Sequence, residues 1–450
     1  MSDVQRADAV YDALLARAGE RWVQPRKERV ARILTLLDDP QRTYRVVHIT
    51  GTNGKTSTAR MIESLLRAHG LRTGLFTSPH LKRFTERIMI DGEPIADAAV
   101  ADAWDEIEPF VSIVDAELEA SGEAPLTFFE LLTVLAFVAA ADAPVDVLVL
   151  EVGMGGSWDS TNTADGDVAV FAPIDLDHAD RLGDTIEAIA EVKAGIIKDG
   201  AAVVSAQQTP EAAAVLRRVA SDRDATIAFE GEQFGLSEQK LAVGGQLLSI
   251  RGLAGDYADE YLPLYGAHQG RNAALAVAAV ESLIGGASQP IAGDILAEGL
   301  QNATSPGRLQ LIGISPTVVV DAAHNPHGAA ALARSLGDSF DFDEWGLVLG
   351  VLADKDAAGI LDGLLPAVTE VFTTAPGSDR AADADLVADL VEQRGRRATV
   401  HESLAEAADA AREWAAASDR RAVIIAGSIV LAGEALLLAE DEDWKSGWRG

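Results

Sequence analysis

The chain has 450 residues, which is enough for two or three domains that each bury a core. Lys and Arg number 37 and Asp and Glu number 70, and the net charge of −33 argues against nucleic acid or anionic membrane as a partner, except at local basic sites. The absence of cysteine excludes disulfides, zinc–thiolate sites, iron–sulfur clusters and a thiol nucleophile. The segment MSDVQRADAV lacks an apolar signal core, and the most apolar stretch is interrupted by Asp142 and Asp146. We therefore expect a cytoplasmic protein with no membrane partner.

Short apolar runs alternate with Ala-, Leu- and Glu-rich helical patterns, which is typical of a doubly wound α/β fold with a parallel sheet. A different pattern, with Gly-Gly and Gly-Asp turns over residues 228–265, predicts a small antiparallel β patch, and a helix is expected over residues 272–283. A new strand–helix series begins near residue 309. We therefore predict an α/β domain over residues 1–300 and a smaller Rossmann-like α/β domain over residues 301–450. The runs expected to be buried strands cover residues 45–49, 145–150, 168–172, 318–320, 347–349 and 423–425.

The first of these strands runs into a glycine-rich loop, GTNGKTS over residues 51–57, which is followed by a helical pattern over residues 58–69. Glycines allow backbone N–H groups to approach phosphate oxygens, and the helix N-terminus and Lys55 add positive charge, while the Thr56 hydroxyl can bind Mg²⁺. The loop is tighter than the common nucleotide loop GxxxxGK[ST], because Ile49 stands where the first glycine would be. We predict a phosphate site; the alternative is an ordinary turn with a surface lysine.

The loop TGTNGKTS resembles the nucleotide loop of the Mur-ligase superfamily, whose members use ATP to join a carboxylate to an amino acid amine. The segment GLFTSPHL over residues 74–81 resembles the loop of the bifunctional dihydrofolate synthase/folylpolyglutamate synthase branch. Further motifs follow in the order of that family: EVGMGG at 151–156, LDH at 176–178, KAGIIK at 193–198, GAHQ at 266–269, PGRL at 306–309, DAAHNP at 321–326, DKD at 354–356 and GS at 427–428.

This resemblance implies an ATP-dependent ligase that adds L-glutamate to dihydropteroate and to the γ-carboxyl of reduced folates through an acyl phosphate. It implies ATP and two Mg²⁺ ions as cofactors, only small molecules as partners, and a monomer. The domain over residues 1–300 would then be the ATP-binding domain with a loop over the pterin, and that over residues 301–450 would bind glutamate.

The resemblance also assigns roles to individual residues. Catalysis is expected from Lys55, His178, Lys193 and Arg308, and metal binding from Thr56, Ser78, Glu151 and His178. ATP is expected to contact Gly51, Thr52, Asn53, Gly54, Lys55, Thr56, Ser57, Asn272, Arg308 and Asp321. The pterin loop would use Ser78, Pro79 and His80, and glutamate would contact Arg87, His324 and Ser428.

Simpler roles stay open for several of these residues. Lys193 has an equivalent that is carbamylated in related ligases, but it could instead be a helix-surface lysine paired with Glu187 or Glu191. Asn272 and Asp321 could be cap or turn residues, as could His324 and Ser428. Two other functions also remain as alternatives: a Mur ligase acting on a nucleotide sugar, and a nucleotide-binding module without ligase activity.

Overall fold

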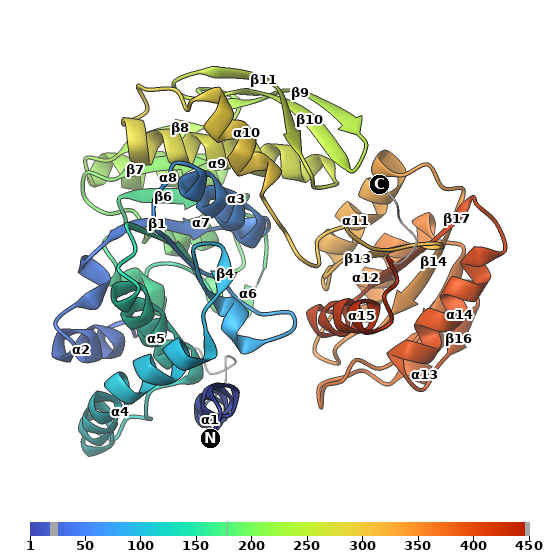
Figure 1. The fold of residues 1–450 in the computed structure, drawn as a ribbon, viewed down its shortest axis with the longest axis horizontal. Helices are drawn as coiled ribbons and strands as arrows, with labels where there is room; N and C mark the ends of the chain where they lie inside the picture. The colour runs from blue at the N-terminus through green and yellow to red at the C-terminus, as the bar shows by residue number, and fades with distance from the viewer. Residues whose placement is uncertain (19–25, 178, 446–450) are drawn as a thin grey trace.

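The computed structural model describes residues 1–18, 26–177 and 179–445. These residues form two bodies, each built on its own sheet with helices on both faces, and a short connection after α10 leads from one to the other (Figure 1). The first two sheets end before residue 263 and the third begins at residue 310. We keep the boundary near residue 300 as a proposal consistent with this order. Within the described residues, no helix is both long and apolar enough to cross a membrane.

The largest sheet has eight strands in the order β4-β3-β2-β5-β1-β6-β7-β8. All its pairs are parallel except the two made by β3, which runs against both of its neighbours. The parallel strands therefore end at one edge, where open α/β sheets bind ligands. The strands are β1 (Arg45–Thr50), β2 (Thr73–Phe76), β3 (Ile88–Ile90), β4 (Glu93–Pro94), β5 (Val147–Glu151), β6 (Val168–Phe171), β7 (Ala202–Ser205) and β8 (Thr226–Phe229).

Helices cover both faces of this sheet because successive strand residues point to opposite sides. In β1, Val47 and Ile49 face the core that contains α3, α9 and α10, whereas Val46 faces the core that contains α1, α2, α4 and α5. Further along, Ala169 and Phe171 of β6 pack with α7 and α8. The helices are α1 (Asp3–Leu15), α2 (Glu28–Leu36), α3 (Lys55–Ala68), α4 (Asp97–Ala120), α5 (Phe128–Asp142), α6 (Ala179–Leu182), α7 (Ile186–Ala194), α8 (Pro210–Asp222), α9 (Ala267–Gly285) and α10 (Gly293–Gln301).

The antiparallel patch is a three-stranded sheet that packs on α9 and α10 (Figure 1). It consists of β9 (Gly235–Ala242), β10 (Gly245–Arg251) and β11 (Asp256–Leu262). The prediction of hairpins is confirmed for these residues. It is wrong for residues 228–229, which belong to β8 and pair in parallel with β7.

The third sheet has the order β12-β13-β17-β14-β15-β16. Its β12–β13 pair is antiparallel, and the other pairs are parallel. One face packs on α11, α12 and α13 and the other on α14 and α15. Its strands are β12 (Gln310–Ile314), β13 (Thr317–Val320), β14 (Glu344–Leu349), β15 (Glu370–Thr373), β16 (Ala398–Val400) and β17 (Arg421–Ala426), and its helices are α11 (Pro326–Ser339), α12 (Ala357–Leu364), α13 (Ala384–Glu392), α14 (Leu404–Ala416) and α15 (Ile429–Asp441).

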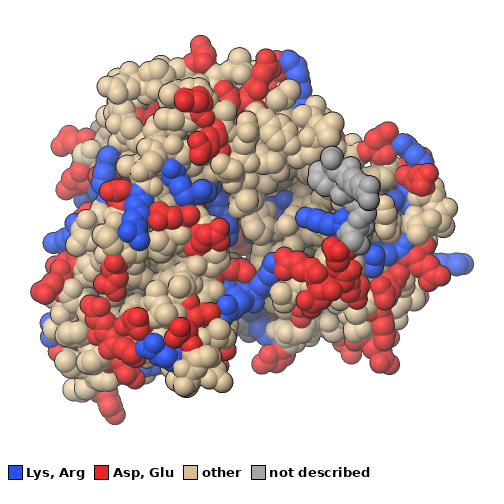
Figure 2. Space-filling model, viewed as in Figure 1, with Lys and Arg blue, Asp and Glu red and all other residues tan. Residues whose placement is uncertain are grey.

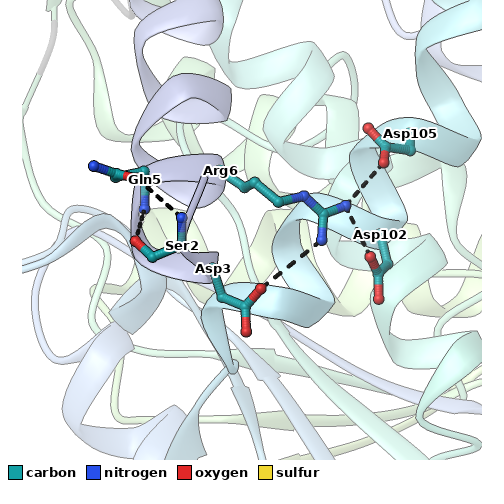
Figure 3. Close-up of polar contacts among 6 residues, drawn as sticks. All are labelled: Ser2, Asp3, Gln5, Arg6, Asp102 and Asp105. Atoms are coloured by element: carbon teal, nitrogen blue, oxygen red, sulfur yellow. Dashed lines mark hydrogen bonds and ion pairs between the residues drawn. The ribbon is translucent and has the colours of Figure 1, made fainter.

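Helix α1 is held on α4 by the ion pairs of Arg6 with Asp102 and Asp105 (Figure 3). The side chain and backbone of Ser2 form a capping box with Gln5, which satisfies free N–H groups at the start of the helix. The Arg6 guanidinium then reaches α4, where Nη2 donates to Asp102 at 3.0 Å and to Asp105 at 2.9 Å (Figure 3). These ion pairs hold α1 next to the segment of residues 80–84, and Tyr11 of α1 contacts that segment.

Candidate active site

The glycine-rich loop is held between the end of β6 and the start of α9. Gly51 has a φ of +147°, and a Cβ placed on it would lie 2.7 Å from the Cβ of Ala172 and 2.9 Å from the Ala172 carbonyl oxygen. Gly54 has a φ of +87° and caps α3, and its Cβ would lie 2.9 Å from Oδ1 of Asn272. Both positions require glycine because the backbone is left-handed and a neighbour fills the space. The helix begins at Lys55, three residues before the predicted start.

Two lysines converge on one carbonyl of this loop. Lys55 Nζ donates to the Gly51 oxygen at 3.0 Å and to the Thr52 oxygen at 3.2 Å, and Lys193 Nζ donates to the same Gly51 oxygen at 3.0 Å. Burial, reinforced by the nearby Lys55 charge, lowers the pKa of Lys193 to about 7. Both side chains line a pocket together with Gly153 and Asp177. The loop is therefore flanked by two ammonium groups that line the same pocket.

The surface alternative for Lys193 is wrong. Only 4% of this residue is exposed, although Glu187 and Glu191 on the same helix are exposed to solvent. Glu191, one of its two expected partners, forms an ion pair with Arg218 instead. The lysine of the KAGIIK segment thus points into the site and not toward solvent.

Thr56 and Glu151 meet between the first turn of α3 and the end of β5. The Thr56 hydroxyl donates to the Glu151 carboxylate at 2.9 and 3.1 Å, and the backbone of Ser78 also hydrogen-bonds to that carboxylate. Glu151 is only 1% exposed, and burial raises its pKa, opposed chiefly by the Lys55 charge. Three of the four predicted metal ligands are therefore adjacent. The fourth, His178, lies outside the described residues.

This donor set fits Mg²⁺. A buried carboxylate and a hydroxyl are hard oxygen ligands, and proteins hold Mg²⁺ with one or two carboxylates while phosphates and water complete the shell. The described part of the chain contains no group of three or more His, Cys, Asp or Glu residues that could hold a metal without such help. The site is therefore suited to a metal that arrives with a polyphosphate.

A second charged group lies where the chain enters the third sheet. The Asp321 carboxylate accepts from the backbone N–H groups of Leu309 and Ala323, both at 2.8 Å, and so holds the turn that carries Arg308. Burial raises the pKa of Asp321, and the neighbouring Arg308 charge opposes this rise. Burial lowers the pKa of His268, which is close enough to Asp321 and Arg308 to sense both charges. His268 belongs to the GAHQ motif of residues 266–269, but the sequence predicts no role for this histidine. It lies one helical turn before Asn272 on α9.

The predicted pterin loop packs on the first body through aromatic and charged contacts. Arg87 is buried, donates from Nε to Nδ1 of His80 at 2.8 Å, and lies over the ring of Phe128. The Tyr11 ring stacks on Phe84, with centroids 5.0 Å apart, and meets His80 edge-on. Arg87, predicted to contact glutamate, is thus placed beside the loop predicted to cover the pterin.

Two predicted contact residues make local hydrogen bonds, and a third, Ser57, pairs with a residue distant in the chain. Ser428 is fully buried and caps α15 by accepting from the Leu431 N–H at 3.0 Å, and Nδ1 of His324 lies 2.9 Å from the Ala322 oxygen. Ser57 is also buried, with its hydroxyl 2.8 Å from that of Ser305. The cap and turn alternatives therefore describe Ser428 and His324, and the binding roles of all three residues stay predictions.

Comparison with known proteins decides the family. The Mur ligase middle domain matches residues 49–280, and the glutamate ligase domain of Mur ligases matches residues 307–429. The dihydrofolate synthase/folylpolyglutamate synthase of Mycobacterium tuberculosis is 45% identical over 446 residues, which cover 93% of this chain and 92% of that protein. The chain belongs to the dihydrofolate synthase/folylpolyglutamate synthase family of Mur ligases.

Solved structures of this family have the same fold. The folylpolyglutamate synthase of Mycobacterium tuberculosis, complexed with ADP and AMPPCP, is 44% identical with a TM-score of 0.91, and the match covers 97% of this chain and 99% of that one. The E. coli FolC structure in complex with DHPP and ADP is 31% identical with a TM-score of 0.82, covering 97% and 98%. The family and the fold class predicted from the sequence are confirmed.

The site of this family member is rich in cations that lack an acidic partner. Among the described residues, no carboxylate forms an ion pair with Lys55, Arg60, Lys193 or Arg308. Lys and Arg side chains are visible beside the hollow between the two bodies, where Asp and Glu side chains also lie (Figure 2). Sequence reasoning missed Arg60, for which the only signal was its position one turn after Thr56.

Proposed function

We propose that this protein is an ATP-dependent ligase that adds L-glutamate to dihydropteroate and to the γ-carboxyl of reduced folates. The observation that carries the proposal is the convergence of Lys55, Lys193 and the Thr56–Glu151 pair on the glycine-rich loop. A carboxylate is a poor electrophile at neutral pH, and phosphorylation by ATP activates it. The relative from Mycobacterium tuberculosis that is 45% identical carries both activities in its name.

The chain's own residues divide the work as follows. Backbone N–H groups of residues 53 and 54 and the start of α3 bind phosphate oxygens, and Lys55 neutralises their charge. Thr56, Ser78, Glu151 and His178 would hold Mg²⁺, which shields the negative charge of the phosphates when it is bound. Asn272 and Asp321 are proposed to contact the adenosine, and Arg308 to reach the phosphates from the second body.

Two displacements complete the proposed reaction. An oxygen of the acceptor carboxylate attacks the γ-phosphorus, the bond to the β-phosphate breaks and ADP leaves. The glutamate amine then attacks the acyl carbon, and collapse of the tetrahedral intermediate releases phosphate and a proton. Arg87, His324 and Ser428 are the proposed contacts of glutamate, and Ser78, Pro79 and His80 those of the pterin.

Lys193 is proposed to be carbamylated. Its amine is buried and has a pKa near 7, so a large fraction is neutral and can add CO₂. The resulting anion would no longer repel Lys55 and could contribute to a second Mg²⁺ site. The chain is proposed to act as a monomer, and its cytoplasmic location stays a prediction.

A paired assay tests the proposed function. Purified protein is incubated with ATP, Mg²⁺ and L-glutamate, and ADP release is followed with dihydropteroate in one series and a tetrahydrofolate in the other. We expect activity in both. Activity with the folate alone would reduce the protein to a polyglutamate synthase, and activity with neither would favour a nucleotide-sugar ligase or a module without ligase activity.

A further inference from the structure

Arg60 lies on α3, one turn after Thr56, and no role has been assigned to it so far. It lines a hollow between the two bodies together with Thr56, His80 and Arg308. It also lines an adjoining hollow with Lys82 and Gln310. The guanidinium is therefore at the junction of the loop, the predicted pterin segment and the second body.

Arg60 has no partner among the residues that the structure describes, since no hydrogen bond or ion pair is formed by its side chain. Burial lowers its pKa, the nearby charges of Glu86, Glu151 and Glu63 raise it, and the charge of Arg308 lowers it. A mostly buried guanidinium that donates no hydrogen bond is stabilised when an anion bonds to it directly.

The carboxylates around Arg60 are already engaged. Glu151 accepts from Thr56, and Glu63 accepts from Thr73 at 2.6 Å and from Arg67 at 3.0 Å. Glu86 accepts from the backbone N–H groups of residues 81–83. Arg67, the next arginine on the same helix, is thus ion-paired, while Arg60 faces a hollow.

We propose that Arg60 binds the reacting carboxylate of the acceptor and holds it beside Thr56 and Arg308. This rests on the proposed function. The loop and Lys55 bind the polyphosphate from one side, so the acceptor must approach the γ-phosphate from the side that Arg60 and His80 line. A planar guanidinium matches a carboxylate with two parallel hydrogen bonds. Both acceptors share this carboxylate, so Arg60 serves both reactions.

The test separates acceptor binding from ATP binding. Binding of dihydropteroate and of a tetrahydrofolate to the full-length protein is titrated by pterin fluorescence, and KM is measured for each acceptor and for ATP. In Arg60→Ala we expect both acceptors to bind at least about tenfold more weakly, while KM for ATP stays within about twofold. Arg60→Lys should recover part of the loss because it keeps the charge.

Arg67→Ala is the matched control, because it removes an arginine from the same helix without facing the hollow. It should leave both acceptor affinities unchanged. Wild-type acceptor affinity in Arg60→Ala, or a defect confined to ATP, would overturn the proposal for Arg60. Inactivity of the wild-type protein with both acceptors would instead overturn the proposed function itself.

Discussion

At the scale of single residues, the site is distinguished by Lys and Arg side chains that form no ion pair with a carboxylate among the described residues. Lys55 and Lys193 donate to the same carbonyl oxygen. Two ammonium groups at such a short separation repel each other. Burial, reinforced by the Lys55 charge, lowers the pKa of Lys193 to about 7. The site therefore contains an amine that titrates near neutral pH.

Lys55→Ala should abolish most ligase activity while leaving the fold intact. Its amine contacts only loop carbonyls and a pocket, so we expect a loss of several kcal/mol of transition-state stabilisation with little effect on stability. ADP release with both acceptors measures the first and thermal unfolding the second. Activity within about threefold of wild type would contradict the assignment of the loop.

Lys193 should react with CO₂ in a pH-dependent way. With a pKa of about 7 the amine is mostly protonated at pH 6 and mostly neutral at pH 8, and only the neutral form adds CO₂. At a fixed partial pressure of ¹³CO₂, the carbamate signal in ¹³C NMR should therefore grow from pH 6 to pH 8. Lys193→Ala should lack the signal and most activity, with partial rescue by small carboxylates. A wild-type protein without the signal at pH 8 would rule out the carbamate.

At the scale of elements, the turn from β1 into α3 sets the site. The strand brings Gly51 against Ala172 at the end of β6, and the helix then starts at once, so Lys55 and Thr56 occupy its first turn. The end of β5 pairs with β1 in register Ile49 to Glu151. Parallel neighbours thus place the carboxylate next to the hydroxyl.

Gly51→Ala should destabilise the protein more than Gly70→Ala. Both glycines have positive φ, but a Cβ at Gly51 meets Ala172 at 2.7 Å, whereas one at Gly70 meets nothing within 4 Å. We expect a loss of about 1 kcal/mol for Gly70→Ala from backbone strain, and at least about 2 kcal/mol for Gly51→Ala. Urea unfolding measures both. Equal losses of unfolding free energy would mean that the loop accommodates a Cβ at residue 51 without strain.

At the scale of the whole molecule, the two bodies meet around the pterin segment. Lys82 forms an ion pair with Glu440 of α15, and His327 Nδ1 lies 3.2 Å from Asp175. A Cβ on Gly433 would lie 2.0 Å from the Leu81 carbonyl oxygen, so the segment packs closely on α15. Closure of the second body onto the first would bring Arg308 toward the phosphates.

Arg308→Ala should lower turnover more than it weakens ATP binding. The contact is proposed to form on closure, so we expect kcat to fall about a hundredfold while the dissociation constant for ATP changes less than about threefold. Steady-state kinetics and nucleotide titration measure the two. The matched control is Arg420→Ala, whose exposed arginine is ion-paired with Asp341 and Asp343 of the same body. A defect in ATP affinity alone would contradict the hinge role.

Much of this protein follows from local sequence patterns. Apolar strand runs and the Gly51–Gly54 spacing depend on neighbours a few residues apart, so the strands, the loop and the family could be predicted from them. Thr56 and Glu151 were predicted together from the resemblance, and the parallel sheet explains why they meet.

The tertiary structure alone decided which polar groups are buried and which are paired. Lys193 reaches a carbonyl 142 residues away, and its helix pattern gave no sign of that. Ser428, whose substrate contact stays a prediction, is buried as the N-cap of α15, while Arg60 and His268 lie near the site without having been selected. The physical reason is that burial and ion pairing depend on segments that are distant in the chain, whereas periodicity and glycine conformation are local properties.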